Sequence, residues 1–447
     1  MRNSRLVLGV AALVLFQGGG VARADNPLIM DQFTADPTAR VFEGKMFLYP
    51  SHDFIPEGGR GRGFAMEDYH AFSSENLMDW KDYGPIVKQT EVPWVNPKNS
   101  MWAPDCVEKG GKYYFYFPAP PKAANGARDV WGIGVAIADH PGGPYRAETT
   151  PIEGAAGIDP CVMIDPKDGQ AYLFYALNKI FVAKLKPNMV ELAGTPEVVQ
   201  NLPTQGLIEG PFAFERKGKY YLTYPHAVGT ERLEYAMADS PMGPYKQVGV
   251  IMDQSASKCW TNHQSLVEYQ GQWYLFYHDK DLSPTNDAKR SAHADYMTFN
   301  EDGTINKVIP TLRGVGIADS RRKIQIDRYS AISKEGVKVS YLDEAKKNDG
   351  WKVELSEKDA FVQYDRVEFG KVALKGVNVR AMSATGGTIE IHLDKPDGPL
   401  LAKVDVPSKG EWSEVKAKLL NAPSDMHNLI VTMLEKKEVH VDWVSFE

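Results

Sequence analysis

A glycine-led pattern of aromatic and aliphatic residues recurs five times in the first 280 residues. Each copy has the form seen in GKYYFYF at 111–117 and GQWYLFYHD at 271–279, in which most positions are apolar. Short apolar runs rich in aromatic residues and bounded by Gly or Pro predict buried β-strands, and few segments have a helical period. The copies begin at Gly44, Gly111, Gly169, Gly218 and Gly271.

The spacing of these strands predicts the architecture. Successive copies begin 67, 58, 49 and 53 residues apart, and a period near 50 is typical of the blades of a β-propeller. A second repeat supports this interpretation, because ADHPGGPY at 138–145 matches ADSPMGPY at 238–245. We therefore expect residues 25–316 to form a five-bladed β-propeller, in which the innermost strand of each blade lines a central channel.

The pattern changes after residue 316. Apolar and polar residues alternate in GGTIEIHL at 386–393 and in VHVDWVSF at 439–446. Such alternation is typical of strands with one buried face, and the length of the segment suits two packed sheets. The sequence therefore predicts an all-β chain in which residues 317–447 form a β-sandwich of jelly-roll type.

The first 24 residues have the pattern of a signal peptide. Arg2 and Arg5 precede the apolar stretch LVLGVAALVLF at 6–16, and Ala22-Arg23-Ala24 fits the small-x-small cleavage pattern. We expect a mature chain that starts at Asp25 and is exported to the periplasm or the medium. An uncleaved membrane anchor is the alternative, although the apolar stretch is short for a span.

Charge and cysteine content narrow the classes of partner. The formal net charge is −7, and the sequence has no basic cluster, which argues against nucleic acid and anionic membranes. The chain has three cysteines, Cys106, Cys161 and Cys259, whose spacing matches no metal motif. We expect buried thiols, with one disulfide as the alternative, and a monomeric protein.

Three acidic residues stand in equivalent settings just before predicted strands. Asp36 precedes Pro37, Asp159 precedes Pro160, and Glu209 lies in IEGP at 208–211. A repeat that places a carboxylate at the same point of several blades gathers these carboxylates around one axis. Paired carboxylates at one centre are what glycosidic bond hydrolysis requires. The alternative is that the acids cap turns, where Asp before Pro is common.

These motifs resemble glycoside hydrolase family 43 over most of residues 27–316. The resemblance rests on the three acids together with MWAPD at 101–105, TNHQS at 261–265, WYLFYHD at 273–279, RS at 290–291 and NEDGTI at 300–305. It implies a five-bladed propeller and an inverting, mostly exo-acting hydrolase of arabinose- and xylose-containing polysaccharides. The C-terminal segment is similar to carbohydrate-binding modules of family 6, on IQID at 324–327, VEFG at 367–370 and VDW at 441–443.

The resemblance also implies roles for individual residues. Asp36 would be the general base, Glu209 the general acid, and Asp159 the third acid, which raises the pKa of the general acid and orients it. Inversion requires the base and the acid on opposite faces of the sugar. Arg290 matches an arginine near these acids, where it would hold a carboxylate or a sugar hydroxyl; an exposed arginine is the alternative.

The recurring polar position is filled by Asp105 in blade two and by His263 in blade five. In the family, the histidine of blade five points into the channel and often helps to hold a calcium ion, directly or through water. Calcium prefers oxygen ligands, so a channel histidine without a metal is the alternative. No organic cofactor is implied.

Further binding residues are expected at the channel mouth and in the tail. Trp102 would stack on a sugar ring, and His52 and Asp53 would bind sugar hydroxyls, with core packing and a loop cap as alternatives. A glycine-rich loop at 56–63 would cover this rim. In the tail, the resemblance implies a sugar-binding role for Trp412 and a structural Ca²⁺ held by Asp327 and Asp442. Trp351 is the candidate aromatic partner of Trp412, with core packing as the alternative.

The sequence thus predicts an exported, inverting exo-glycosidase of the α-L-arabinofuranosidase or β-xylosidase type, whose partner is a polysaccharide or oligosaccharide. Two other classes remain open: a non-catalytic sugar-binding propeller and a propeller that serves as a protein scaffold. A related exo-activity, such as galactan hydrolysis, also remains open. The three acids at matched positions favour the enzyme, because a scaffold has no reason to place carboxylates around a channel.

Overall fold

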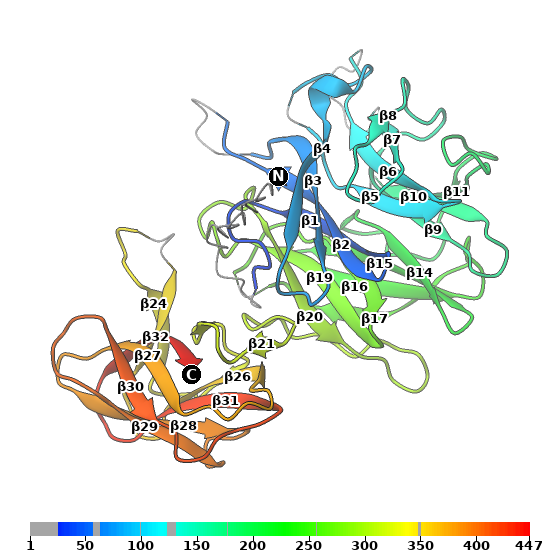
Figure 1. Cartoon of the computed structure of the whole chain (residues 1–447). Helices are drawn as coiled ribbons and strands as arrows, with labels where there is room; N and C mark the ends of the chain where they lie inside the picture. The colour runs from blue at the N-terminus through cyan, green and yellow to red at the C-terminus, as the bar shows by residue number, and fades with distance from the viewer. Residues whose placement is uncertain are drawn as a thin grey trace, which may run out of the picture.

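The computed structural model describes residues 26–56, 63–98, 100–122, 131–176, 178–255, 257–346 and 350–447. The predicted signal peptide at 1–24 and residues 57–62 of the predicted rim loop lie outside these residues. Figure 1 shows two β-rich bodies, an N-terminal one drawn from blue to yellow-green and a C-terminal one drawn from yellow to red. Within the described chain, no helix has the length and apolar character needed to cross a membrane.

Five antiparallel sheets, one for each copy of the repeat, form the N-terminal body. Blade one contains β1 (Ala35–Phe42), β2 (Lys45–Asp53), β3 (Met66–Ser74) and β4 (Lys81–Lys88), and the short 3₁₀ helix η1 (Gln89–Glu91) follows it. Blade two contains β5 (Asp105–Lys109), β6 (Lys112–Ala119), β7 (Gly132–Ala138) and β8 (Arg146–Ala147). Blade three contains β9 (Ile158–Ile164), β10 (Ala171–Ala176), β11 (Ile180–Lys184) and β12 (Glu197–Val198).

The last two blades vary this plan. Blade four contains β13 (Leu207–Ile208), β14 (Phe212–Arg216), β15 (Lys219–Val228), β16 (Thr230–Ala238) and β17 (Lys246–Met252). Blade five contains β18 (Ser265–Tyr269), β19 (Gln272–Asp279) and β20 (Ser291–Met297). The first strands contact one another in the order β1, β5, β9, β14, β18 and back to β1, which closes a ring of five blades. The predicted five-bladed propeller is therefore confirmed.

Contacts between the first and last blades close the ring. The Ser265 hydroxyl of β18 donates to the Pro37 carbonyl at 2.8 Å and accepts the Ala39 amide at 2.9 Å. The segment before β1 runs along β20, where the Leu28 amide donates to the Ala292 carbonyl at 2.8 Å. These bonds join residues more than 220 positions apart, so the start and the end of the propeller stabilise each other.

The repeated glycine has a conformational reason. In every blade it lies in the tight turn that precedes β2, β6, β10, β15 or β19, with φ between +74° and +80°. A Cβ added at any of these five positions would meet no atom within 4 Å, so space does not select glycine. The left-handed backbone does, because it strains every residue that has a Cβ. This requirement is what makes the repeat visible in the sequence.

Two packed sheets form the C-terminal body. One contains β21 (Ala318–Asp319), β26 (Phe361–Glu368), β31 (Met426–Met433), β28 (Gly387–Leu393) and β29 (Leu400–Val406), with β23 (Ala331–Ile332) paired to β26. The other contains β24 (Val337–Tyr341), β25 (Trp351–Leu355), β32 (Val439–Phe446), β27 (Gly376–Met382) and β30 (Ser413–Lys418), with β22 (Ile324–Gln325) paired to β32. Alternate residues of both sheets form one apolar core. The body is a β-sandwich, although the predicted domain boundary at residue 316 stays a prediction.

The propeller and the sandwich share several contacts. Met78 of blade one packs into the apolar core of the sandwich. Arg328 is 2% exposed, and its Nη1 donates to the Asn26 carbonyl of the propeller at 2.6 Å. Arg313 Nε donates to the Asp365 carbonyl at 2.9 Å. We call this contact region the joint. A buried arginine that bridges the two bodies indicates a fixed contact rather than a flexible tether.

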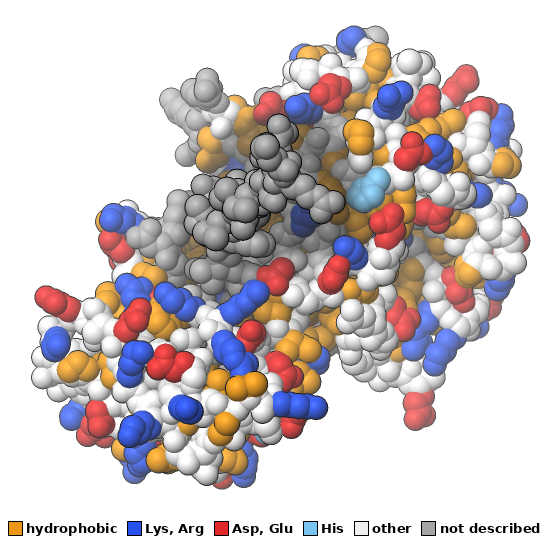
Figure 2. All heavy atoms as spheres, viewed as in Figure 1, with side chains coloured by type: hydrophobic (Ala, Val, Ile, Leu, Met, Phe, Trp, Pro, Cys, Tyr) orange, Lys and Arg blue, Asp and Glu red, His pale blue; other side chains and the backbone are white. Residues whose placement is uncertain are grey.

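The thiols are buried inside the propeller, and the surface visible in Figure 2 carries charges of both signs. Cys106, Cys161 and Cys259 are buried and free, as expected, so the disulfide alternative is wrong. Figure 2 shows acidic and basic side chains interspersed over the visible face of both bodies. This mixture agrees with the absence of a basic cluster from the sequence.

Candidate active site

The three predicted acids occupy the same structural position in three blades, an interruption of the innermost strand. In blade one the register of β1 on β2 shifts between Ala35 and Thr38, and Asp36 lies at this shift. In blade three the register of β9 on β10 shifts between Phe174 and Ala176 of β10, and Asp159 of β9 lies at this shift. In blade four Glu209 lies between β13 and β14, which pair with β15 in two separate pieces.

Backbone conformation explains how each interruption presents a carboxylate. Asp36 and Asp159 have φ of +48° and +56°, and each precedes a proline, which cannot donate a ladder hydrogen bond. In blade four the residue with positive φ before the proline is Gly210, at +52°, and Glu209 stands one position earlier. Bulges of this kind re-aim side chains near active sites. The longer Glu side chain therefore starts from a different backbone position than the two Asp side chains.

The three acids converge on one pocket with about 650 Å³ of open space. Asp36, Asp159 and Glu209 all line it, as do the predicted residues Trp102, His263 and Arg290. Asp105, the equivalent residue of blade two, does not belong to this lining. It is 1% exposed and pairs with Arg40 at 2.7 Å, so its charge is balanced inside the propeller. The pocket thus contains three of the four acids that occupy the recurring position.

Arg290 holds Asp36 in its ionised form. Arg290 Nη1 donates to Asp36 Oδ1 at 2.8 Å, and the Ser51 hydroxyl donates to Asp36 Oδ2 at 2.8 Å. Burial alone would raise the pKa of Asp36, but the Arg290 charge and the neighbouring His278 outweigh burial and hold that pKa well below its ordinary value. A carboxylate that stays ionised and faces a pocket is suited to act as a base.

Asp53 positions this arginine. Its two carboxylate oxygens accept Arg290 Nε at 3.0 Å and Nη2 at 3.1 Å, and one of them also accepts the Arg290 amide at 2.9 Å. Asp53 is 1% exposed and is not part of the pocket lining among the described residues. The expectation that Asp53 binds a sugar hydroxyl is therefore corrected, because its oxygens are committed to Arg290.

Two buried histidines flank Asp36. The Asp36 amide donates to His278 Nδ1 at 3.0 Å, and His278 Nε2 lies 3.0 Å from the Thr261 carbonyl. This pattern fixes the neutral tautomer with its proton on Nε2. His263 Nδ1 is 4.0 Å from Asp36 Oδ1, and burial lowers the pKa of His263 to about 4. Both rings are therefore neutral near pH 7, which leaves Arg290 as the cation beside the base.

The other side of the pocket is crowded with carboxyl groups. Burial, and then the charges of Glu209 and Asp36, raise the pKa of Asp159 well above its ordinary value, while the Gly210 amide donates to Asp159 Oδ2 at 2.9 Å. Burial and the charge of Glu209 raise the pKa of Glu231 to about 9. Carboxylates this close cannot all ionise cheaply, so the group retains protons near pH 7. A retained proton is what a general acid must supply.

Aromatic side chains form one wall of the pocket. Trp102 packs edge-on against Phe64, with ring centroids 5.8 Å apart. Phe64 also stacks on Trp260, at 6.1 Å and an interplanar angle of 21°, and the Arg290 guanidinium lies 4.8 Å from the centre of the Phe64 ring. Trp260 is 64% exposed at the pocket mouth. Flat rings beside carboxylates can stack on the apolar face of a sugar.

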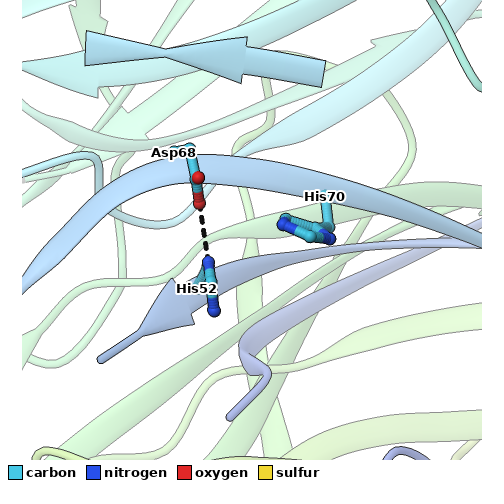
Figure 3. A group of neighbouring side chains, drawn as sticks. All are labelled: His52, Asp68 and His70. Carbon is cyan, nitrogen blue, oxygen red and sulfur yellow. Dashed lines mark hydrogen bonds and ion pairs between the residues drawn. The ribbon is translucent and has the colours of Figure 1, made fainter. Parts of the chain in front are cut away.

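His52 belongs to a separate cluster beside the pocket. Figure 3 shows the Asp68 carboxylate pointing at His52 with His70 beside them, and the His52 Nδ1 to Asp68 Oδ1 distance is 2.6 Å. Potential ligand atoms of the three residues lie within 4.8 Å of one another. Asp82 contacts His70 Nδ1 at 3.0 Å. Among the described residues, the pocket lining does not include His52, so the geometry does not support its predicted sugar contact.

The expected calcium site in the channel lacks a direct ligand set. In the described chain, no group of three potential ligands contains His263, and the Asp36 carboxylate 4.0 Å from it is already paired with Arg290. A calcium ion takes six to eight oxygen ligands. The residues around His263 therefore do not fit an ion bound by side chains alone, and the chemistry below uses none.

The predicted residues of the sandwich have other partners. Asp442 pairs with Arg380, and Asp327 pairs with Arg328 at 3.1 Å, so arginines occupy the place expected for calcium. Neither acid belongs to a possible ligand group among the described residues. The Arg380 guanidinium also lies 5.0 Å from the ring centre of Trp412, which is only partly buried. Trp351 lies at the joint, under Arg328 at 4.4 Å.

Carboxylates gathered at one end of a propeller channel, with a cation fixing one of them and an aromatic wall beside them, are the elements of a glycoside hydrolase site. Comparison with known families agrees. The chain belongs to the glycosyl hydrolases family 43, whose model matches residues 24–305. Members of this family hydrolyse glycosidic bonds with inversion. Residues 331–447 match the carbohydrate-binding module of family 6.

Individual relatives agree with this assignment. The chain is 36% identical to xylosidase/arabinosidase 43A of Humicola insolens, over 62% of this chain and 98% of that protein. A solved β-xylosidase/α-arabinofuranosidase from a compost microbial metagenome, in complex with xylotriose and in a calcium-free form, is 33% identical. It superposes with a TM-score of 0.58 over 64% of this chain and 98% of its own.

A third relative shares the order of both bodies. The arabinoxylan arabinofuranohydrolase of Bacillus subtilis covers 95% of this chain and 97% of its own, with a TM-score of 0.56 and 22% identity. At that identity the likeness concerns the fold alone.

Sequence reasoning missed several residues of the pocket. Glu231 follows the hairpin between β15 and β16, and Trp260 and Asn262 precede β18. Phe64 precedes β3. Phe64, Trp260 and Asn262 lie in connections, and Glu231 lies at the very start of β16, so no period aligns these positions between blades. One of them could have been found from the sequence, because Asn262 is the chain neighbour of the predicted residue His263.

Proposed function

We propose that the protein is an exported exo-acting β-xylosidase that also releases α-L-arabinofuranose from xylan-derived glycans. The observation that carries this proposal is the single pocket that contains Asp36, Asp159 and Glu209 behind the aromatic wall. A pocket accepts the end of a chain, whereas an endo-acting enzyme needs an open groove through which the chain passes. The pocket's size suits a terminal sugar and the start of the next residue.

In this proposal Asp36 activates the attacking water. Its carboxylate is ionised and held by Arg290 and Ser51, so it can accept a proton from water on one face of the terminal sugar. Glu209, from blade four, donates its proton to the leaving oxygen on the opposite face. The anomeric carbon is then attacked from the face opposite the departing sugar, which inverts its configuration.

Asp159 and Glu231 keep a proton available for this step. Both are buried beside Glu209, and the repulsion between neighbouring carboxylates is mutual. A proton therefore costs less to hold on this group of acids than on isolated carboxylates. Asp159 also fixes the turn that contains the acid, because its Oδ2 accepts the Gly210 amide at 2.9 Å.

The choice of xylose and arabinose rests on the relatives. Three that align with the propeller are named xylosidase/arabinosidase or β-xylosidase, at 33–36% identity. Two that extend over both bodies are named arabinoxylan arabinofuranohydrolase, at 25–26% identity. We weight the former because identity in the propeller bears on the pocket itself.

The test is a panel of nitrophenyl glycosides followed by xylobiose, xylotriose, arabinoxylan, arabinan and galactan. We expect hydrolysis of the β-D-xyloside and the α-L-arabinofuranoside, and release of single xylose units from xylotriose. The Asp36→Asn variant should be inactive on all of them. Activity confined to galactan, or xylobiose released from the interior of long chains, would contradict the proposal.

The proposed export can be tested by the N-terminal residue of the protein after expression. Cleavage after Ala24 would give a mature N-terminus at Asp25. N-terminal sequencing of protein recovered from the periplasm or medium of an expressing bacterium should find Asp25 first. Recovery of the whole pool in the membrane fraction with an intact Met1 would support an uncleaved anchor instead.

The sandwich would add affinity for polymeric substrate. Its family model is that of a carbohydrate-binding module, and a linked module raises the local concentration of the enzyme on its substrate. Trp412 is the aromatic residue we assign to glycan contact, because Trp351 is engaged at the joint. Trp412→Ala should weaken retention on insoluble xylan while leaving hydrolysis of nitrophenyl xyloside unchanged. If the parent and Trp412→Ala are retained equally on insoluble xylan, Trp412 does not contact the glycan.

A further inference from the structure

A second group of potential metal ligands lies on blade five, outside the catalytic pocket. Asp279 ends β19, Asp281 follows it in the next connection, and His293 is on β20. Potential ligand atoms of the three residues lie within 4.8 Å of one another. In Figure 1 these strands are on the side of the propeller that faces the sandwich.

Neither carboxylate forms an ion pair with Lys or Arg among the described residues, although Arg328 acts electrostatically on Asp281 and Lys280 on Asp279. Among the described residues, no Lys or Arg nitrogen lies within 4.0 Å of either, and the adjacent Lys280 pairs with Asp287 at 2.7 Å. The hydrogen bonds to Asp279 come from the Ser255 and Ser257 hydroxyls and the Lys280 amide, and all reach Oδ1. Asp279 is buried and Asp281 is partly buried, so the two close carboxylates repel each other and the arrangement favours a bound positive charge.

His293 provides a buried nitrogen directed at the same point. The residue is 2% exposed, and in the described chain its Nε2 has no hydrogen-bond partner. The nearest acidic atom is Asp281 Oδ2, at 3.5 Å. A buried nitrogen that makes no hydrogen bond normally costs free energy.

We propose that Asp279, Asp281 and His293 bind a divalent transition-metal ion at the joint between the propeller and the sandwich. One imidazole and two carboxylates suit Zn²⁺ or Mn²⁺ better than Ca²⁺, which prefers oxygen ligands. Ligands of Zn²⁺ at about 2.0–2.2 Å stand no more than about 4 Å apart. The His293–Asp281 distance of 3.5 Å already meets this limit, and the Asp279 ligand atom lies within 4.8 Å of the other two.

The His52–Asp68–His70 cluster of Figure 3 has a weaker claim to an ion. Each histidine there already has a carboxylate partner, His52 with Asp68 at 2.6 Å and His70 with Asp82 at 3.0 Å. These pairs satisfy Nδ1 of both rings without a metal. The cluster therefore serves as the matched control, since it has the same residue types without the unpartnered nitrogen.

The position of the blade-five site gives the ion a structural consequence. Asp281 lines a cavity of about 400 Å³ together with Asp327, Arg328 and Trp351 of the sandwich. An ion on Asp281 would fix the connection between β19 and β20 against this surface. A ligand that binds the folded protein and not the unfolded chain raises its stability. We therefore expect the ion to stabilise the joint without entering the hydrolytic reaction.

The test uses the full-length protein after dialysis against a chelator. Zn²⁺ is titrated by isothermal calorimetry and Tm is measured with and without the ion. His293→Asn and Asp281→Asn should each bind one fewer equivalent of Zn²⁺ than the parent and lose its rise in Tm, whereas His70→Asn should match the parent. Co²⁺ should give a visible absorption band in the parent that both blade-five variants lack.

Folding of the variants is checked by circular dichroism and by hydrolysis of nitrophenyl xyloside. The Asp281→Asn variant keeps the test valid if His293→Asn does not fold. The proposal would be overturned if a folded blade-five variant bound as many equivalents of Zn²⁺ as the parent and showed the same rise in Tm. Loss of the same equivalent in His70→Asn would overturn it as well, because the ion would then bind at blade one.

Discussion

Arg290 and Asp36 are 254 positions apart in the chain and meet at 2.8 Å in the catalytic pocket. Asp53 accepts hydrogen bonds from Nε and Nη2 of the same guanidinium, so the cation is fixed before substrate arrives. Both partners are at least 95% buried, which strengthens their electrostatic interaction relative to water. This pair determines the protonation state of the proposed base.

Arg290→Met should raise the pKa of the base. Without the guanidinium, burial dominates and favours the protonated form of Asp36. Because the base must be ionised, the acidic limb of the kcat/KM profile should move to higher pH, by about 1–3 units. Asp53→Asn is the control, since it leaves the arginine charge in place. If the acidic limb of the kcat/KM profile does not move in Arg290→Met, Arg290 does not set the pKa of the base.

Glu231 should make stability depend on pH. Its pKa is about 9 in the folded protein, owing first to burial, and about 4.3 in an unfolded chain. Between these values the folded state holds a proton that the unfolded state has released, so stability falls as pH rises. Glu231→Gln removes this loss. The Tm of the variant relative to the parent should therefore be higher at pH 8 than at pH 5, and an equal difference at both would refute the assignment.

Trp260 should contribute to substrate binding rather than to chemistry. It is exposed at the pocket mouth and stacks on Phe64, so a sugar beyond the terminal residue can contact it. Trp260→Ala should raise KM for xylotriose about 2–10-fold, with kcat nearly unchanged, for an aromatic contact of about 0.5–1.5 kcal/mol. Trp412→Ala is the control, because that residue is on the sandwich. A fall in kcat with an unchanged KM would indicate that Trp260 acts in the chemical step rather than in substrate binding.

The sandwich should stabilise the propeller. Arg328 is buried and bonds to the Asn26 carbonyl, and Met78 packs into the core of the sandwich. Removal of residues 318–447 should therefore lower Tm, and Arg328→Met should lower it in part. Arg321→Met is the matched control, since the Arg321 side chain is 40% exposed. If the truncated protein melts at the parent temperature, the joint is not a stabilising contact.

The sequence predicts the blades and the three acids well, because both depend on local backbone requirements. The repeated glycine is needed for a left-handed turn, and Asp36 and Asp159 precede prolines at strand interruptions. Such requirements leave a mark at fixed positions of every repeat. The sandwich is likewise visible from the alternation of its strands.

The partners of these residues could not be predicted in the same way. Asp53 and Arg290 are 237 positions apart, and only closure of the ring brings them together. Asp105 has the same place in the repeat as the three acids of the pocket, yet Arg40 neutralises it. The position in the repeat therefore predicts where the backbone places a side chain. The charged partner of that side chain depends on long-range packing.

The central claim is that Asp36 acts as the base and Glu209 as the acid. The most direct measurement is kcat/KM of Asp36→Asn and Glu209→Gln on xylobiose and on dinitrophenyl xyloside, whose leaving group needs little protonation. Asp36→Asn should lose about 10²–10⁴-fold on both substrates, and Glu209→Gln should lose as much on xylobiose but far less on the aryl xyloside. The account is contradicted if either variant keeps more than about a tenth of parental activity on xylobiose, or if Glu209→Gln loses equally on both.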